Sequence, residues 1–378
     1  MNIQIQDSRS LLLSVGAVSF LGGMSYGFVY KYPDPPPEPI IQPTSNIPLE
    51  PTPPDVTIRI KAVGDIIPGT NYPRNRLHPK KESLFQAVKP TLQGADLLFG
   101  NFESTLTNYP YSAKQIGGMM IAFRTPPSYA SLLKNVGFDI LSVANNHSYD
   151  FTVQGFRDTI TNLESSGLQA LGQKNKILYA YLKDLSIAWI GFSSFNYHNS
   201  LNNLPEATAL VQEASQNANI VVISVHAGAE GTGAMHVRNR TEDFYGENRG
   251  NLVQFSHTMI DRGADLILGH GPHVPRALEI YKGKLIAYSL GNFMGYPTLS
   301  TQGELAYSLV LDVKLNNRGD LVSGQIIPIM LNGQGIPYPD SQGRSIRLLR
   351  QLTQKDFPHT PLTINNKGQI TPKFPIAN

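Results

Sequence analysis

Five apolar runs between residues 56 and 270 end abruptly in polar side chains, and this pattern constrains the fold more than any other feature of the chain. Short apolar runs bounded by turn residues are typical of buried β-strands. The residues at the five ends are Asp65, Glu103, Asn145 to His147, His226, and His270 with His273. Helix-like segments lie between the runs, at 85–92, 127–136, 152–165 and 252–261. The alternation predicts an α/β fold with a central sheet.

The strands expected after residue 285 break this alternation. Runs at 285–290, 305–313 and 321–330 follow one another without a helix-like segment, and a hairpin turn at Tyr281–Lys284 precedes the first of them. A further strand is expected at 187–192. These strands predict two sheets that pack face to face with helices outside.

The polar residues at the strand ends have the chemistry of metal ligands. They comprise one Asp, one Glu, two Asn and four of the nine histidines, and the chain has no Cys. Carboxylate, amide and imidazole ligands suit divalent Mn, Fe, Zn or Mg. They outnumber the ligands of one tetrahedral zinc, whereas two ions about 3.5–4 Å apart would use them all. Such a pair of ions is typical of phosphoester hydrolysis.

Each residue also has a purely structural interpretation. Asp65 can cap a turn, Glu103 can be a solvated loop carboxylate, Asn145 and Asn146 favour turns, and His226 can be a hydrogen-bonded core histidine. The carboxyl ends of strands in an open α/β sheet, however, are where ligand sites form. The recurrence of such residues at this one kind of position favours the metal interpretation.

His147 and Asp150 form a second predicted pair. His147 has the chemistry of a general acid that protonates a leaving oxygen, with Asp150 fixing its tautomer. Asp150 can alternatively cap a helix that starts near Thr152.

Three residues are expected to contact the substrate, namely Asn101, Asn145 and Arg276. An arginine can bind an anionic substrate, although Arg276 can also be an ordinary surface arginine. The remaining histidines are interpreted as structural: His78, His198, His236, His257 and His359.

The N-terminal part of the chain differs in composition from the rest. Leu11–Tyr30 has no charged residue and is long enough to cross a bilayer. An uncleaved anchor is favoured over a signal peptide cut near Ser25–Gly27, because the apolar run continues to Tyr30. A buried core helix is a third interpretation, which the proline-rich sequence that follows disfavours.

The chain is therefore divided into a short N-terminal segment (1–9), a membrane anchor (10–30), a proline-rich linker (31–55), a globular domain (56–330) and a C-terminal extension (331–378). The linker favours extended polyproline II structure and predicts a stalk that holds the domain on the extracytoplasmic side. A net charge of +3, without a basic block, gives no indication of nucleic-acid binding.

Several motifs resemble the CapA family of poly-γ-glutamate capsule synthesis proteins (PgsA-like). They are Gly64-Asp65, Gly100-Asn101-Phe102-Glu103, Ala144 to Asp150, Ser224-Val225-His226, Gly269 to Val274 and Tyr288 to Phe293. That family is similar to the calcineurin-like metallophosphoesterases, so the resemblance implies a four-layer α/β/β/α sandwich with two metal ions and agrees with an N-terminal transmembrane helix.

The resemblance also implies roles for individual residues. It places Asp65, Glu103, Asn146, His226, His270 and His273 on metal positions and His147 on the catalytic position. The chain departs from the pattern at Ile67 and Gly271, where relatives have histidine, at Glu103, where aspartate is usual, and at Ala227, where tryptophan is frequent.

We therefore expect a single-pass cell-membrane protein with a metallophosphatase domain that acts in synthesis or export of an anionic polymer such as polyglutamate. Its expected partners are the membrane, an anionic polymer or phosphoester substrate, and a polymer synthesis complex. Two alternatives stay open: a phosphoesterase unrelated to capsule, and a non-catalytic subunit that binds polymer or partner proteins. His147 and Asp150 favour activity, whereas Ile67 favours the binding role.

Overall fold

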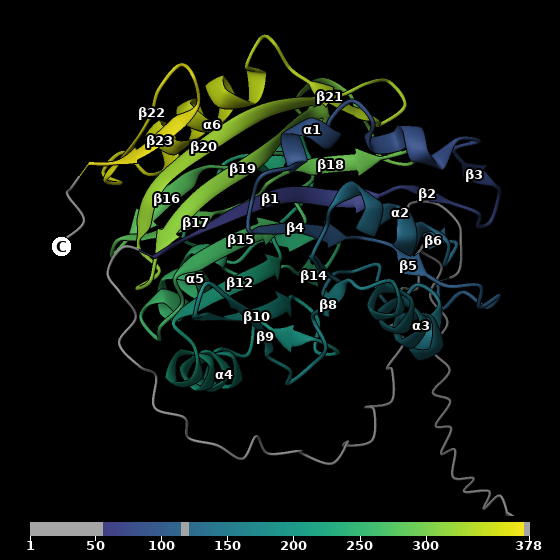
Figure 1. Cartoon of the computed structure of the whole chain (residues 1–378), viewed down its shortest axis with the longest axis horizontal. Helices are drawn as coiled ribbons and strands as arrows, with labels where there is room; N and C mark the ends of the chain where they lie inside the picture. Colours follow the sequence, from purple (N-terminus) through teal and green to yellow (C-terminus); the bar gives the residue numbers. More distant parts are fainter. Residues whose placement is uncertain (1–55, 115–120, 374–378) are drawn as a thin grey trace, which may run out of the picture. The chain divides into compact units, whose positions relative to one another are not determined.

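The polar strand ends of this chain lie at the edges of two sheets. The computed structural model of the protein describes residues 56–114 and 121–373, all of which belong to one compact unit (Figure 1). The first sheet has ten strands, with β22-β23-β20-β19-β1-β4-β7-β8 in order, β18 beside β1 and β21 beside β20. Its strands are β1 (Thr57–Ile67), β4 (Leu97–Phe102), β7 (Ile140–Ser142), β8 (Gln169–Leu171), β18 (Asn292–Gly295), β19 (Tyr307–Asn316), β20 (Leu321–Leu331), β21 (Pro337–Pro339), β22 (Leu362–Ile364) and β23 (Gln369–Pro372).

The second sheet has seven strands, in the order β11-β10-β12-β15-β17-β16 with β9 beside β10. Its strands are β9 (Leu178–Leu182), β10 (Leu185–Ser193), β11 (Asn199–Ser200), β12 (Ile220–His226), β15 (Leu266–His270), β16 (Leu278–Tyr281) and β17 (Lys284–Ala287). β16 and β17 form the predicted hairpin, whose two turn residues Lys282 and Gly283 have φ of 49° and 82°.

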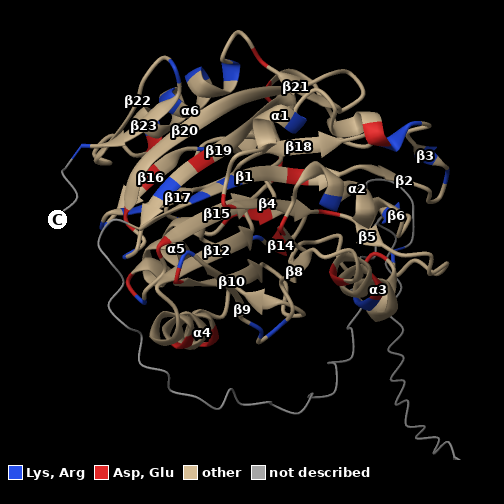
Figure 2. Cartoon of the chain, in the orientation of Figure 1, with Lys and Arg blue, Asp and Glu red and all other residues tan. Residues whose placement is uncertain are grey.

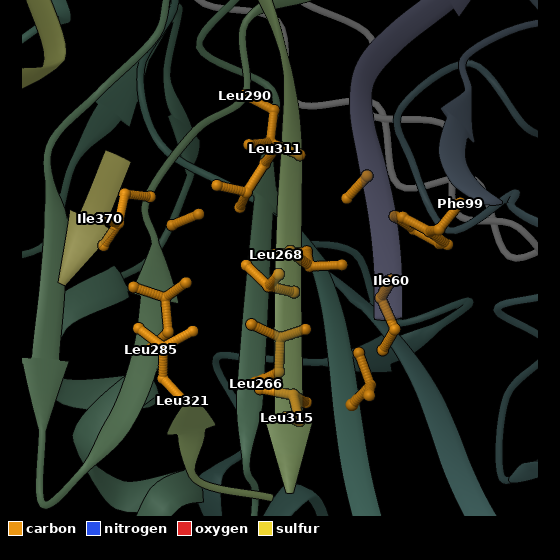
Figure 3. Close-up of a cluster of buried hydrophobic side chains, with 14 of the residues drawn as sticks. Ile60, Phe99, Leu266, Leu268, Leu285, Leu290, Leu311, Leu315, Leu321 and Ile370 are labelled. Carbon is orange, nitrogen blue, oxygen red and sulfur yellow. The ribbon is translucent and has the colours of Figure 1, made fainter. Parts of the chain in front are cut away.

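A single apolar core joins the two sheets. Ile58 and Ile60 of β1 and Leu311 of β19 meet Trp189 of β10 and Leu268 of β15 in one buried cluster, part of which Figure 3 shows between the strands. Burial of this apolar surface is the main force that holds the sheets face to face. The predicted sandwich of two sheets is confirmed.

Helices cover the outer face of each sheet. Side chains of η1 (Lys81–Phe85), α1 (Lys89–Leu92), α2 (Tyr129–Val136) and α3 (Thr152–Ser165) pack on the first sheet, whereas α4 (Leu204–Asn217) and α5 (Leu252–Ile260) pack on the second. Figure 1 shows α2 and α3 apart from α4 and α5, as this layering requires. The remaining short elements are β2 (Gly69–Thr70), β3 (Arg76–Leu77), β5 (Thr105–Leu106), β6 (Arg124–Thr125), η2 (Thr232–Ala234), β13 (Asp243–Phe244), β14 (Glu247–Asn248) and η3 (Gly303–Ala306).

The structure corrects several sequence-based boundaries. The helix predicted at 85–92 is instead η1 followed by the short α1, since Pro90 can begin a helix but cannot continue one. Helix α4 was missed, although Asn203 accepts a hydrogen bond from the Glu206 amide at its start and Pro205 follows, a combination that marks helix N-termini.

The predicted extension after residue 330 is not separate from the domain. β21 pairs with β20, and β23 pairs with β20 at the edge of the first sheet. Helix α6 (Arg344–Asp356) buries Ile346 and Leu349 in the core between the sheets and Leu352 in the outer core of the second. The C-terminal region therefore completes the sandwich.

Among the helices of residues 56–114 and 121–373, none is both long enough and apolar enough to cross a bilayer. The predicted anchor, Leu11–Tyr30, lies outside the described residues.

Candidate metal centre

The register of the first sheet places three polar residues side by side. β1 is parallel to both β4 and β18, so that Asp65 is paired with Asn101 on one side and Asn292 on the other. The backbone also packs closely here, because a Cβ on Gly64 would lie 1.8 Å from the Gly291 carbonyl oxygen. The Asp65 amide donates a hydrogen bond to that same oxygen, at 2.9 Å. Glycine at position 64 therefore allows the β18 loop to approach Asp65.

The second sheet contributes two histidines in register. β12 and β15 are parallel, and their last residues, His226 and His270, are paired. Both side chains are buried, at 1% and 0% exposed. These are the positions at which the apolar runs were predicted to end.

Short distances connect the residues of the two sheets. The Asp65 carboxylate lies 3.5 Å from His270 Nδ1 and 3.2 Å from His273 Nδ1. Glu103 Oε1 lies 3.7 Å from His226 Nε2 and 3.8 Å from His273 Nε2. Ligand atoms of Asp65, Glu103 and His226 all lie within 4.8 Å of one another. Figure 2 shows acidic segments near the labels of β1 and β4. Asp65 lies in β1, and Glu103 directly follows β4.

A strained turn holds the last histidine in this cluster. His273 has φ of 60°, a left-handed conformation that is uncommon for residues other than glycine, and Gly271 has φ of 110°. A Cβ on Gly271 would lie 3.0 Å from the Ala227 carbonyl oxygen and 3.2 Å from the His226 ring. Both the left-handed backbone and these close contacts disfavour a side chain at position 271.

The buried polar atoms of this cluster fit a metal site. Among the described residues, several buried atoms of the cluster have no hydrogen-bond partner: Asp65 Oδ2, both Glu103 carboxylate oxygens, His226 Nε2, and both ring nitrogens of His270. The predicted ligand atom Asn146 Oδ1 is also buried without a partner, but no measured contact joins it to the cluster. Burying such groups without partners is costly, so buried carboxylates and imidazoles are normally paired or bind metal. Oxygen and nitrogen donors of this kind suit divalent ions.

The pKa values of the cluster residues depend on burial and on one another's charges. Burial raises the pKa of Glu103 well above its usual range, and the charges of Asp65 and Glu230 add to this effect. Burial acts to lower the pKa of His273, but Glu103 and Asp65 reverse this and raise it to about 10. Burial also lowers the pKa of His226 well below its usual value. A neutral His226 has the lone pair that a metal ligand needs.

His147 and Asp150 form the predicted pair. His147 Nδ1 lies 2.8 Å from Asp150 Oδ2, which also accepts a hydrogen bond from the Phe123 amide at 2.7 Å. The alternative role for Asp150 is not observed, because the cap position of α3 is Phe151 and no side chain caps this helix. Asp150 orients the imidazole, and a hydrogen bond through Nδ1 leaves Nε2 to transfer a proton.

The three predicted substrate-binding residues occupy structural positions. The Asn101 amide donates to Asp65 Oδ1 at 2.8 Å and lies 3.3 Å from His226 Nδ1, and the Asn145 amide donates to Asn101 Oδ1 and the Phe102 carbonyl. Arg276 is fully buried, and its two terminal nitrogens donate to Glu242 at 3.0 and 2.9 Å. Asn101 therefore contacts the candidate ligands Asp65 and His226, Asn145 holds Asn101 in place, and Arg276 belongs to a buried ion pair.

Four residues near the cluster were not predicted. Lys114 Nζ lies 2.5 Å from Asp150 and 3.3 Å from His147 Nδ1, and Asn292 Oδ1 lies 2.9 Å from His273 Nδ1. Glu230 lies 3.7 Å from His273 Nε2 and pairs with Arg249 at 3.1 Å. Asn292 stands in the Tyr288–Phe293 motif and follows an apolar run, so sequence could have indicated it. The other three lie in loops without such a signal.

Four of the histidines interpreted as structural have partners consistent with that role. His198 is buried between the hydroxyls of Ser148 and Ser193. His236 and His257 pair with Asp356 and Glu279, and His78 contacts the Lys80 backbone.

The fold and site define an α/β sandwich protein with a buried carboxylate–imidazole cluster at the carboxyl ends of its strands. The family model described as "Bacterial capsule synthesis protein PGA_cap" matches residues 59–296, and the chain belongs to this family. The matched region contains every residue of the cluster, and the predicted resemblance is confirmed.

Individual relatives are similar over most of the domain. The "PGA biosynthesis protein CapA" of Bacillus subtilis (strain 168) is 32% identical over 260 residues, which cover 64% of each chain. The "Capsule biosynthesis protein CapA" of Bacillus anthracis is 26% identical over 315 residues, covering 77% of this chain and 72% of that one. The aligned part thus spans less than two thirds of the Bacillus subtilis protein.

Among solved structures, the chain is similar to the 5'-nucleotidase precursor from Thermus thermophilus. The match covers 79% of this chain and 59% of that one, with a TM-score of 0.40 and 10% identity.

Proposed function

We propose that this protein is a metal-dependent phosphoester hydrolase that acts in the synthesis or export of poly-γ-glutamate or a similar anionic extracellular polymer. The observation that carries this proposal is the convergence of Asp65, Glu103 and His226, whose buried ligand atoms lie within 4.8 Å of one another. The printed names of the two Bacillus relatives support the capsule context.

Different residues of this chain are assigned to metal binding and to proton transfer. Asp65, Glu103, Asn146, His226, His270 and His273 would hold two divalent ions. Bound ions of this kind would neutralise charge on the phosphoryl oxygens and activate water. Asn101 and Asn292 keep the side chains of Asp65 and His273 in place through their hydrogen bonds, and Asn145 supports Asn101.

Proton transfer is assigned to His147. Its Nδ1 atom is held by Asp150, so Nε2 is the atom that would give a proton to the leaving oxygen. Burial and the nearby charge of Lys114 lower the pKa of His147. Because Asp150 engages Nδ1, Nε2 carries a proton only in the imidazolium form of His147, which the lowered pKa makes a minor but strongly acidic species near neutral pH.

The decisive experiment measures metal content and turnover in the same preparation. Purified full-length protein would be loaded with Mn, analysed for bound metal, and assayed on a panel of phosphoesters beside His147→Ala. Two equivalents of metal, with hydrolysis lost in the variant and metal retained, would support the proposal. Protein that takes up no metal and hydrolyses no phosphoester would refute it.

A second candidate function is a non-catalytic subunit that binds polymer or a synthesis complex. It is favoured by Ile67, a fully buried core residue where metallophosphoesterases have a metal-binding histidine. Metal uptake without turnover, together with co-purification of polymer, would favour this role.

We further propose that Leu11–Tyr30 anchors the protein in the cell membrane and that the domain is extracytoplasmic. The apolar length of this segment and the proline-rich linker after it support this placement. A reporter fused after Asn378 would be active outside the cytoplasm, and cytoplasmic activity would refute the orientation.

A further inference from the structure

Arg249 is a buried cation beside the candidate metal centre. It is neither a proposed metal ligand nor the proposed general acid. It is only 3% exposed. Its backbone amide donates to the Glu242 carbonyl at 2.8 Å, and its carbonyl accepts from the Gly228 amide at 3.0 Å, two residues after His226. The main chain therefore fixes Arg249 next to the end of β12.

The guanidinium of Arg249 is held in one orientation but is not fully paired. Nε lies 2.8 Å from Glu247, and Nη2 lies 3.1 Å from Glu230. The rings of Phe195 and Phe244 lie 5.9 and 5.4 Å from its central carbon, in cation–π contact. Nη1, which carries two N–H groups, is buried and has no hydrogen-bond partner among the described residues. Two donors are thus left for a ligand.

A second unpaired group lies at the same edge. Ser194 follows the last residue of β10, and its hydroxyl is buried without a partner in the described parts of the chain. The Asn202 amide lies 3.3 Å from both the Ser194 and the Asn248 carbonyl oxygens, so the Ser194 backbone lies close to the residue that precedes Arg249.

Arg249 is coupled to the metal-ligand residues. Its partner Glu230 lies 3.7 Å from His273 Nε2. Arg276, in contrast, uses both terminal nitrogens on Glu242.

We propose that Arg249, assisted by the Ser194 hydroxyl, binds an oxyanionic group of the substrate beside the metal centre. A buried guanidinium with free N–H groups matches the paired oxygens of a phosphoryl group or a carboxylate. The inference rests on the proposed function, because it places the anion next to the proposed metal ions, and it makes Arg249 the specificity residue in place of Arg276.

The test is anion binding to the full-length protein by titration calorimetry, with and without Mn. Inorganic phosphate and glutarate serve as probes of the phosphoryl and carboxylate sources. We expect Arg249→Gln to weaken binding of the preferred probe about 10- to 100-fold while metal content is retained. Ser194→Ala should weaken it a few-fold, roughly in line with loss of one neutral hydrogen bond. The control Arg238→Gln, which removes an exposed arginine paired with Asp356, should leave binding unchanged.

The probes and variants separate the possible outcomes. If Arg249→Gln weakens the binding of phosphate, the group bound by Arg249 is a phosphoryl group. If the variant weakens the binding of glutarate, that group is a carboxylate of the polymer. Absence of binding of either probe to the wild-type protein, or equal affinity in Arg249→Gln, would overturn the inference. If Arg249→Gln does not fold, the affinities of Arg249→Lys and Ser194→Ala for the probes are measured instead. Wild-type affinity in both variants would overturn the inference.

Turnover distinguishes this inference from the proposed function. If the wild-type protein hydrolyses no phosphoester but binds anions through Arg249, the anion site is supported and the hydrolase function is refuted. If hydrolysis is observed and Arg249→Gln binds anions normally, the hydrolase function is supported and the role of Arg249 is refuted.

Discussion

Asp65 Oδ1 lies 3.5 Å from the Nδ1 atom of His270, although the two residues belong to different sheets. The apolar core between the sheets sets this distance, because it fixes how the ends of β1 and β15 face each other. Both side chains are fully buried. A change in either sheet's packing would therefore alter the cluster as directly as a change in a ligand.

Glu103→Gln should have opposite effects on the metal-free and metal-loaded protein. Both carboxylate oxygens of Glu103 are buried without hydrogen-bond partners in the described structure. Replacing this carboxyl group, whose ionised form burial disfavours, with an amide should raise the free energy of unfolding of chelator-treated protein by about 1 to 3 kcal/mol. In excess Mn the variant should be less stable than wild type, because it binds metal less tightly. Urea denaturation under both conditions measures the effect, and destabilisation in both would contradict it.

Asp150→Asn should lower kcat without removing metal. The amide can still contact His147 Nδ1 but does not enforce the same tautomer, and it no longer balances the charge of Lys114. If His147 is the general acid, proton transfer by this residue should contribute a factor of roughly 100 or more to kcat. We expect Asp150→Asn to lose most of this factor. Steady-state kinetics with metal analysis provides the measurement. Unchanged kcat would show that Asp150 is not needed to position the acid.

Gly271→Ala should destabilise the protein by about 1 to 3 kcal/mol. The position has φ of 110°, and the new Cβ would lie 3.0 Å from the Ala227 carbonyl oxygen.

Substitutions at two other glycines separate the cost of the positive φ from the cost of the contact with Ala227. Gly94→Ala, with φ of 82° but no atom within 4 Å of the added Cβ, should cost only about 1 kcal/mol from the backbone alone. Gly233→Ala, with open space and no positive φ, should change stability by less than about 0.5 kcal/mol. Chemical denaturation of the three variants gives the ranking, and an equal cost at 271 and 94 would exclude the contact with Ala227.

Arg276→Met should destabilise the fold by about 3 to 5 kcal/mol, because it leaves Glu242 in a largely buried site without its partner. The double variant Arg276→Met with Glu242→Gln should recover part of this loss. Thermal unfolding of the two variants is the measurement. A variant as stable as wild type would show that the ion pair contributes little.

His198 should make the protein less stable at acid pH. Burial lowers its pKa from 6.5 to about 3. Between these values the unfolded chain binds a proton that the folded chain does not, so stability falls as the pH decreases from about 6.5 towards 3 and is unaffected by this group above that range.

The His198 contribution to the slope is at most about 1.4 kcal/mol per pH unit. Urea denaturation of His198→Gln across this range should show a shallower pH dependence than wild type. Parallel curves for the two proteins would contradict the assignment.

The sequence alone was sufficient to predict most strands and the residues that end them. Asp65, Glu103, His226 and His270 were predictable because a buried strand is a local pattern of apolar residues, and a polar residue that interrupts it is visible in the sequence. The H-x-x-D spacing likewise indicated the pairing of His147 with Asp150. Helices α4 and α6 were not predicted, although Asn203 and Pro205 mark the start of α4 and the buried residues Ile346, Leu349 and Leu352 recur at helical spacing in α6.

Only the tertiary structure decided which of these side chains meet and what each one does. The register of β1 with β4 and β18, and the packing of one sheet on the other, bring Asp65 within reach of His270 and His273. The same packing buries Arg276 against Glu242 and leaves Nη1 of Arg249 without a partner among residues 56–114 and 121–373. Hydrogen-bond partners and burial depend on residues distant in sequence, so local patterns identify candidate ligands, whereas the fold assigns their roles.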